Sequence, residues 1–174
     1  MNGASISRLH QMRREGHHRC LVCAHPELKL NFALEGPHRL RSSVDFTDDM
    51  VGFNGMIHDG ILALLLDEAV TCALLAEGHY AATADLSLRY LHPVKPAPTA
   101  HIFVSTLKRA RELFETKAEL HQENRLCTRA TARMMIQPLR IGHEAPTTAP
   151  ADPVGAGAGG YGPNLPDLSD AYRR

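Results

Sequence analysis

A long apolar helix in the middle of the chain limits most strongly how this sequence can fold. The helix is predicted to begin near Asp59 or Gly60 and to run to about Glu77, because Gly78 is a typical residue for ending a helix. Its apolar side chains are too many for a single stripe against one face of a sheet. The rest of the chain must therefore cover this helix on several sides.

Two adjacent acids, Asp67 and Glu68, interrupt the apolar run of this helix. A carboxylate among buried residues is costly to keep unless it is hydrogen-bonded, neutralised or used in chemistry. Asp67 is therefore the first candidate for a functional residue. The alternative is a satisfied buried acid that is bonded to a serine or a backbone amide.

Alternation of apolar and polar residues with a period of two predicts the strands that cover the helix. The predicted strands span residues 28–34, 40–46, 82–91, 100–109, 112–121 and 125–137. Short polar connections separate the last three strands, as is typical of antiparallel neighbours. The sequence thus predicts an α+β domain in which an antiparallel sheet of about six strands wraps one long central helix.

Composition favours one globular domain that does not bind nucleic acid. The chain has 174 residues, 44% hydrophobic content and a formal net charge of zero, so it can bury a core and carries no excess of positive charge. Residues 1–20 lack the apolar run of a signal peptide, and the apolar window 61–76 contains two acids and is too short to span a bilayer. We therefore expect a cytoplasmic protein without a membrane partner.

The C-terminal part of the chain differs in composition from the rest. Six of the 11 prolines and six of the 13 glycines lie from Pro138 onward. This composition is typical of a flexible segment. We therefore expect an N-terminal extension over residues 1–19, a folded domain over residues 20–137 and a flexible tail over residues 138–174.

Cys20 and Cys23 form a C-x-x-C motif that is flanked by His17, His18 and His25. These residues offer enough ligands in a short span for a zinc site, but a single C-x-x-C motif without a second pair is weak evidence. A reduced pair packed under the first strand is the simpler interpretation. From the sequence we expect no bound metal and no other cofactor.

Two motifs around the helix are typical of one enzyme family. His58 and Asp67 stand nine positions apart, and the strand that follows the helix ends in Tyr-Leu-His-Pro over residues 90–93, an aromatic-x-x-Pro turn. This pattern resembles the hotdog-fold acyl-CoA thioesterases, in particular the branch similar to phenylacetate-pathway thioesterases. The resemblance covers about residues 20–137 and implies the hotdog fold.

The resemblance also implies a reaction, the hydrolysis of an acyl-CoA thioester. In the family, the thioester carbonyl is polarised by the backbone N–H of the residue after the His, which here is Asp59. A carboxylate on the helix, usually from the partner subunit, acts as general base or nucleophile, and Asp67 matches it. Thr83 matches a residue that orients the attacking water, although a threonine in a strand is often only a good strand former. The resemblance implies a homodimer or a dimer of dimers with a shared active site, and His58 is expected to be a hydrogen-bonding loop residue.

Further residues are candidates for contacts with the substrate. Basic side chains near strand ends can meet the phosphates of coenzyme A, although solvated strand ends also carry such charges. Glu68 lies roughly 100° around the helix from Asp67, and the nine-residue spacing selects Asp67 as the working acid. The substrate-binding candidates are Gly60, Asn54, Glu68, Arg89 and Lys95.

Two positions depart from the pattern of the family. Asp59 stands where relatives have glycine, so its carboxylate can oppose the oxyanion, bind a cation, change the protonation of Asp67 across the interface or cap the helix. We expect the carboxylate to be the helix N-cap. Gly52 stands where some relatives have asparagine, and Asn54 follows two positions later.

The unusual Asp59 motivates a second function class. A hotdog dimer that binds an acyl thioester or a related ligand without turning it over is the alternative to a thioesterase. A hydratase on the same fold is disfavoured, because the sequence lacks the usual aspartate and histidine spaced five apart on a loop and helix start.

Overall fold

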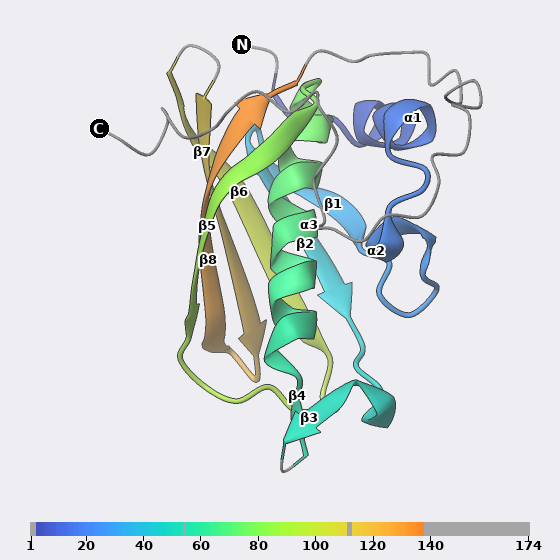
Figure 1. Ribbon diagram of the computed structural model, residues 1–174, viewed down its shortest axis with the longest axis vertical. Helices are drawn as coiled ribbons and strands as arrows, with labels where there is room; N and C mark the ends of the chain where they lie inside the picture. The colour runs from blue at the N-terminus through green and yellow to red at the C-terminus, as the bar shows by residue number, and fades with distance from the viewer. Residues whose placement is uncertain (1–2, 54, 111–112, 138–174) are drawn as a thin grey trace, which may run out of the picture. The chain divides into compact units, whose positions relative to one another are not determined.

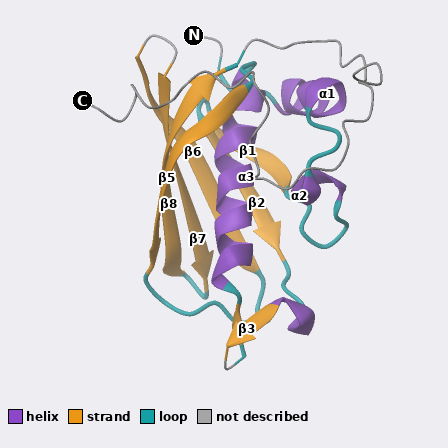
Figure 2. Cartoon of the chain, viewed as in Figure 1, coloured by secondary structure: helices purple, strands orange, loops and turns teal. Residues whose placement is uncertain are grey.

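The structure is a computed structural model that describes residues 3–53, 55–110 and 113–137 (Figure 1). Asn54 and the predicted tail over residues 138–174 lie outside the described residues. The helices are α1 (Ile6–Gly16), α2 (Leu21–Ala24), the short 3-10 helix η1 (Asp48–Met50) and α3 (Asp59–Glu77). The strands are β1 (Asn31–Gly36), β2 (Arg39–Val44), β3 (Val51–Phe53), β4 (Met56–Ile57), β5 (Ala81–Tyr90), β6 (Ala100–Ala110), β7 (Leu113–Gln122) and β8 (Arg125–Ile136) (Figure 2).

The long helix α3 has the bounds that the sequence predicts. It ends at Glu77 because Gly78 adopts a φ of +91°, a left-handed conformation that glycine enters without strain. The N–H of Gly78 then satisfies carbonyl groups of the last helical turn, those of Leu74 and Leu75. Leu65 and Leu66 are fully buried, so the middle of the helix lies in the core.

Six strands form one antiparallel sheet in the order β1-β2-β6-β7-β8-β5. Each predicted strand is present, with ends shifted by a few residues. The helix α3 packs against β5, β6, β7 and β8 and runs along the face of the sheet (Figure 1). This arrangement confirms the predicted α+β hotdog fold, an antiparallel six-stranded sheet with one long helix packed against it.

The other side of α3 is covered by α1 and α2, which the strand and helix patterns did not predict (Figure 1). α1 lies inside the predicted N-terminal extension and buries Leu9 and Met12. Ser5 caps α1 by accepting the N–H of Arg8. The hydroxyl of Tyr80 donates to the carbonyl of Met12 at 3.0 Å, which joins α1 to the segment after α3. The first segments of the chain therefore belong to the folded structure.

β5 is an edge strand of the sheet, and none of its ten residues is buried. Among the described strands it pairs with β8 alone, and a bulge at Ala84 interrupts that pairing. An unpaired edge of this length exposes a row of backbone hydrogen-bonding groups. None of the helices in the described ranges is long and apolar enough to cross a membrane.

Candidate functional site

His58 occupies the N-cap position of α3 and is held by hydrogen bonds of its ring and of its backbone. Its Nδ1 atom accepts the N–H of Gly60 at 2.9 Å, and its own N–H donates to the carbonyl of Met50 at 2.9 Å. Gly52 packs against it so closely that an added Cβ would lie 3.0 Å from the Cα atom of His58. The structure thus places His58 as a hydrogen-bonding residue at the helix start, and its predicted part in the reaction stays a prediction.

The expectation that Asp59 caps the helix is wrong. Asp59 is the first residue inside α3, and the cap hydrogen bond comes from the residue before it. A helix that begins one residue earlier moves the capping position from Asp59 to His58. The Asp59 carboxylate remains in the first turn, where the helix dipole favours a negative charge.

The backbone of Asp59 offers a free hydrogen-bond donor at the start of α3. Within the described residues, no hydrogen bond uses the N–H of Asp59, whereas its carbonyl accepts the hydroxyl of Tyr90 at 3.1 Å. Burial raises the pKa of the Tyr90 phenol, and the negative charge of Asp59 raises it further. An unpaired amide at the positive end of a helix is suited to binding an anionic or polarised oxygen.

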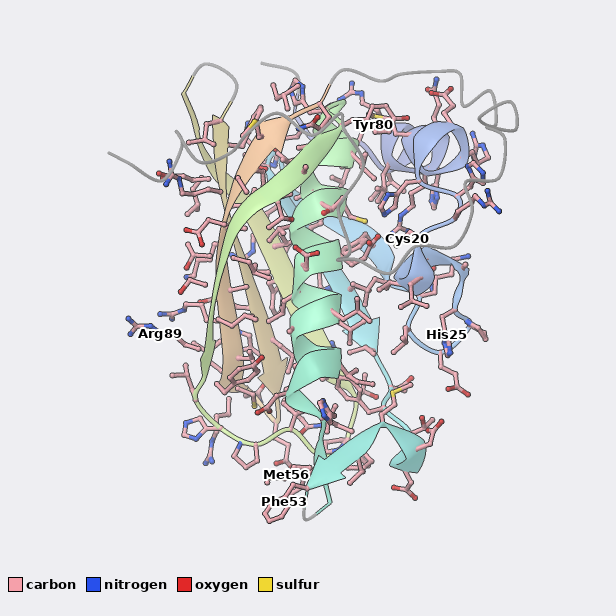
Figure 3. The ribbon with its side chains drawn as sticks, in the orientation of Figure 1. Cys20, His25, Phe53, Met56, Tyr80 and Arg89 are labelled. Atoms are coloured by element: carbon pink, nitrogen blue, oxygen red, sulfur yellow. The ribbon has the colours of Figure 1, made fainter. Side chains whose placement is uncertain are left out.

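Asp59 is one of the residues that line a pocket of about 560 Å³ at the start of α3. The pocket has an apolar wall in which Phe53 is 70% exposed, although large aromatic side chains are normally buried. Figure 3 shows Phe53 and Met56 together at this end of the structure. The lining residues are Gly52, Phe53, Met56, Ile57, His58, Asp59, Leu62, Tyr90, Leu91, His92, Pro93 and Val94.

Asp67 and Thr83 form a second part of the candidate site. The hydroxyl of Thr83 on β5 donates to Oδ1 of Asp67 at 2.7 Å. Asp67 is half-buried, not enclosed in the core as its apolar neighbours suggested, and it lies with Leu64 and Thr71 on the least buried stripe of α3. Thr83 precedes the bulge at Ala84, a feature that commonly re-aims side chains near functional sites. Neither Asp67 nor Thr83 lines the pocket at the helix start.

Glu68 is the acid that is truly buried, with 5% of its surface exposed. Its carboxylate accepts hydrogen bonds from the thiols of Cys20 and Cys23 near α2 and of Cys72 on α3, and it contacts His17. Glu68 does not line the pocket at the start of α3. The structure therefore does not place it where a substrate-binding residue would lie. The sequence offered only the C-x-x-C motif and the i,i+4 spacing of Glu68 and Cys72 as signals of this cluster.

The electrostatics of the cluster favour the charged forms of Glu68, His17 and Cys23. Burial acts to raise the pKa of Glu68, but hydrogen bonds from His17 and Cys23 outweigh it and hold the pKa at about 2. Hydrogen bonds to Cys23 and to Glu68 raise the pKa of His17 to about 9. Hydrogen bonding to Cys72 is the leading cause that lowers the pKa of Cys23 to about 6. Burial is the leading cause that raises the pKa of Cys20 to about 11 and the pKa of Cys72 well above its ordinary value. The cluster therefore favours negative charge on Glu68 and Cys23 and neutral thiols at Cys20 and Cys72.

The remaining substrate-binding candidates lie at two places. Arg89 is exposed on β5 and projects outward from the sheet (Figure 3). Lys95 lines a smaller pocket of about 270 Å³ that shares His92 and Pro93 with the larger one. The backbone N–H of Lys95 donates to the side chain of Gln122 at 3.0 Å, which fixes this segment beside β7. Lys95 is therefore near the candidate site, whereas Gly60 contributes its N–H to the cap.

The central part of the chain matches a known family. Residues 54–128 match the model of the thioesterase superfamily. A search of curated proteins finds no match. The matched residues include α3, β5, β6, β7 and the start of β8. Both Asp67 and Thr83 therefore lie in the matched part.

Solved structures share the fold at low identity. A thioesterase superfamily protein is 21% identical with a TM-score of 0.58, and the match covers 61% of this chain but only 55% of that protein. A hypothetical thioesterase protein of Streptococcus pneumoniae TIGR4, solved with coenzyme A, is 18% identical with a TM-score of 0.58 over 62% of this chain and 87% of that chain. A phenylacetic acid degradation-related protein of Ralstonia eutropha JMP134 is 23% identical with a TM-score of 0.62, over 74% and 98% of the two chains. The family match and the shared fold together confirm the resemblance: residues 54–128 are similar to the thioesterase superfamily, and the described residues have the hotdog fold.

Proposed function

We propose that this protein is an acyl-CoA thioesterase, which hydrolyses an acyl-CoA thioester to a free acid and coenzyme A. The observation that carries the proposal is the hydrogen bond between Thr83 and Asp67 at an uncovered edge of the sheet. A carboxylate that is oriented by a hydroxyl and open on one side is suited to activating water or attacking a carbonyl carbon. The free N–H of Asp59 supplies the complementary donor for the carbonyl oxygen.

The two parts of the site require two copies of the chain. Asp59 and Asp67 are eight residues apart on one helix, which corresponds to about 12 Å along its axis. A single thioester carbonyl needs both groups within a few ångströms, so one copy cannot supply both. The site is complete only if Asp67 of a second copy faces the pocket beside Asp59 of the first.

The edge strand β5 supports this assembly. Leu86 and Leu88 on β5 are only half-buried, and Leu64 on α3 is half-buried beside Asp67. A second copy that covers this edge would bury these apolar groups and pair the free backbone groups of the strand. The same contact would bring the two Asp67–Thr83 pairs to the interface.

The reaction then follows from the positions of these groups. Asp67 of the second copy takes a proton from water, whose oxygen attacks the thioester carbon, or attacks that carbon directly to form an anhydride that water then cleaves. The N–H of Asp59 stabilises the oxyanion of the tetrahedral intermediate. Collapse of the intermediate breaks the C–S bond, and the thiolate of coenzyme A leaves and takes up a proton. Thr83 holds the carboxylate in position during both steps.

Two solved variants of the pneumococcal relative carry substitutions at an aspartate and a threonine, the same residue types as Asp67 and Thr83. In that protein one aspartate and one threonine were each replaced by alanine, and the two positions are sixteen apart. Asp67 and Thr83 are also sixteen positions apart. Lys95 and Arg125 beside the smaller pocket supply positive charge for the phosphates of coenzyme A.

The proposal is tested by incubating the full chain with acyl-CoA substrates of short, medium and aromatic acyl groups. Chromatographic separation of free coenzyme A is the suitable readout, because Cys20 and Cys23 are free thiols that would react with a disulfide reagent. We expect turnover of at least one acyl class that is lost in Asp67→Asn. Absence of turnover across all classes by the well-folded chain would reject the thioesterase.

A binding protein without turnover is the second candidate, and Asp59 is the observation that favours it. Its carboxylate lies close enough to the pocket to raise the pKa of Tyr90, so it places negative charge where an oxyanion would form. Calorimetric titration with coenzyme A and with a nonhydrolysable acyl-CoA analogue separates the two functions. Binding without turnover would support this second candidate.

A further inference from the structure

A cluster of four metal-binding side chains lies on the opposite side of α3 from β5. One ligand atom from each of His17, Cys20, Cys23 and Glu68 lies within 4.8 Å of the other three. They come from the segment after α1, from α2 and from the middle of α3. Figure 3 shows Cys20 between α2 and α3. Two stretches of the chain, residues 17–23 and the middle of α3, thus place their donor atoms around one point.

The hydrogen bonds in this cluster are unusual for a buried acid. Glu68 accepts from the thiols of Cys20, Cys23 and Cys72 at 2.9–3.1 Å. Thiols are weak hydrogen-bond donors, and taking a carboxylate out of water costs several kcal/mol per ion. Strong donors such as hydroxyls or amides are the usual partners of a buried carboxylate. Thiols gathered around a carboxylate are instead the arrangement expected of metal ligands.

We infer that His17, Cys20, Cys23 and Glu68 bind a zinc ion. In a tetrahedral zinc site with bonds of about 2.0–2.3 Å, ligand atoms lie about 3.3–3.8 Å from one another. Here Nε2 of His17 lies 3.1 Å from Oε2 of Glu68, and the Sγ atoms of Cys20 and Cys23 lie 3.1 and 3.0 Å from that carboxylate. These three contacts lengthen by less than an ångström to reach the tetrahedral geometry, and the other separations, of up to 4.8 Å, shorten by about an ångström or less.

The donor set selects zinc over the common divalent ions of cells. Two thiolates and an imidazole are soft or borderline ligands, whereas magnesium and calcium prefer oxygen atoms. Four protein ligands leave no open position for water or substrate, which is typical of a structural site. The binding of zinc displaces the proton on Nε2 of His17 and the protons of the two thiols, which pass to the solvent, so the deprotonated cluster is the form that holds the ion.

Two further residues hold the carboxylate ligand in place. The thiol of Cys72 donates to Oε1 of Glu68 at 2.9 Å, and the guanidinium of Arg13 lies 3.7 Å from the same oxygen. Arg13 also donates to the carbonyl of Leu30 at 3.1 Å, which anchors it beside β1. Such partners orient a metal ligand without binding the metal. Cys72 and Arg13 both contact Oε1, so Oε2 of Glu68 is left for the ion, and the guanidinium of Arg13 balances the negative charge of the carboxylate.

The site would fasten the N-terminal segments to the helix that carries Asp67. α1 and α2 contact α3, and Glu68 is the α3 ligand that directly follows Asp67. Glu68 and Asp67 are about 100° apart around the helix. A zinc ion bound by Glu68 therefore does not occupy the side of α3 on which the Asp67 carboxylate lies. The inferred role is structural, so it does not depend on which reaction the other face of α3 supports.

The test is the metal content of the full chain, purified from zinc-supplemented cells without chelator. We expect about one zinc per chain. We expect at least a ~100-fold loss of zinc affinity, measured by competition with a chromophoric chelator, in His17→Gln, Cys23→Ser and Glu68→Gln. Each matched control removes an imidazole or a thiol that is not one of the four inferred ligands. His18→Gln removes an exposed histidine next to His17, and Cys127→Ser removes a buried thiol on β8, so both should keep the wild-type affinity.

Cobalt substitution tests the ligand set without any variant. Chelator-treated wild-type protein is titrated with Co²⁺, and we expect thiolate-to-cobalt charge-transfer bands and the intense visible bands of a tetrahedral ion. Cys72→Ala should keep both sets of bands, because Cys72 supports Glu68 and is not a ligand. Zinc-free wild-type protein that binds no Co²⁺, or a Cys20–Cys23 disulfide in the isolated protein, would overturn the inference. Loss of cobalt binding in Cys72→Ala together with its retention in Glu68→Gln would overturn the assigned ligand set.

Discussion

Thr83 on the edge strand donates its hydroxyl hydrogen to Oδ1 of Asp67 on the central helix at 2.7 Å. This contact fixes one oxygen of the carboxylate and leaves the other available. It also ties α3 to β5, a strand of which no residue is buried. The first two predictions concern the two partners of this hydrogen bond.

Replacement of Asp67 by asparagine tests the proposed base or nucleophile. We expect Asp67→Asn to lower kcat by at least ~100-fold, because an amide keeps the shape of the carboxylate but can neither take a proton nor attack carbon. Thr83 can still donate to the amide oxygen, so the melting temperature should change little. Steady-state kinetics and thermal unfolding measure the two effects.

The matched control for this variant is Glu115→Gln, which neutralises an exposed acid on β7. It should retain wild-type kcat. Full activity in a well-folded Asp67→Asn protein would remove Asp67 from the mechanism and leave the hydrogen bond to Thr83 as a structural contact.

Two replacements of Thr83 distinguish the contribution of its hydroxyl from that of its β-branched shape. Thr83→Val removes the donor to Asp67 and keeps the β-branched side chain that suits a strand. We expect a fall of about tenfold in kcat, equivalent to the loss of one hydrogen bond of ~1.4 kcal/mol in the transition state. Thr83→Ser should restore most of the activity. Equal kinetics for the valine and serine variants would show that the hydroxyl has no part in the reaction.

The fold could be predicted because its signals are local. The apolar run and Gly78 define α3, and period-two alternation defines the strands of the sheet. α1 carries too few apolar residues for a clear helical pattern, since Leu9 and Met12 account for most of its buried surface. Its place in the structure depends on tertiary contact with α3, which a local pattern does not contain.

The candidate site was predicted less completely, for two physical reasons. The cost of burying an acid pointed to Asp67, but in the structure Glu68 is the buried acid of the pair and Asp67 is half-buried. The choice of Asp67 as the working acid rests on its spacing from His58 and stays a prediction. The cluster around Glu68 joins residues as far as 51 positions apart, so only the folded chain brings His17 to Glu68. The capping residue depends on whether α3 begins at Asp59 or at Gly60. A sequence pattern does not define a helix end to a single residue.

His58 offers a test of the cap that the structure reveals. His58→Ala removes the acceptor for the Gly60 N–H and should lower the free energy of unfolding by about 1 kcal/mol. His58→Asn should restore that stability, because asparagine is a favoured N-cap. Denaturant unfolding curves measure both changes.

The same pair of variants distinguishes a cap from a catalytic group. If His58 acts only through the helix start, His58→Asn keeps kcat within a few-fold of the wild type. Loss of kcat in His58→Asn with full stability would instead assign His58 a role in proton transfer.

The charge of Asp59 is predicted to slow the reaction. Because the carboxylate does not cap α3 and lies near Tyr90 at the pocket, it places negative charge close to the developing oxyanion. Asp59→Asn removes this charge and keeps the backbone N–H, so we expect kcat/KM to rise by about tenfold, which corresponds to ~1.4 kcal/mol. The pKa of Tyr90 should fall in the same variant. Asp48→Asn, which neutralises an exposed acid in η1, is the control and should change neither quantity. An unchanged kcat/KM in Asp59→Asn would mean that the carboxylate does not act on the oxyanion.

Subunit complementation tests whether one active site uses two chains. Asp59→Pro removes the proposed oxyanion donor with little damage to the fold, because proline is favoured at the first helical position and has no N–H. The preceding residue, His58, has φ −61° and ψ 130°, a conformation that a following proline allows. Homodimers of Asp59→Pro lack the amide, and homodimers of Asp67→Asn lack the carboxylate, so both should be nearly inactive.

A mixture of the two variants, unfolded and refolded together, should regain activity. In each mixed dimer one site combines an intact Asp59 N–H from one chain with an intact Asp67 from the other, while the second site lacks both groups. Random pairing makes half of the dimers mixed, so we expect about one quarter of wild-type activity, with a mass by light scattering of at least twice 19.1 kDa. Refolded wild type sets the scale, and each variant refolded alone sets the background. No recovery in a mixture that contains mixed dimers, or a monomeric wild-type chain that is fully active, would contradict a shared site, because each chain would then have to supply both groups itself across about 12 Å of helix.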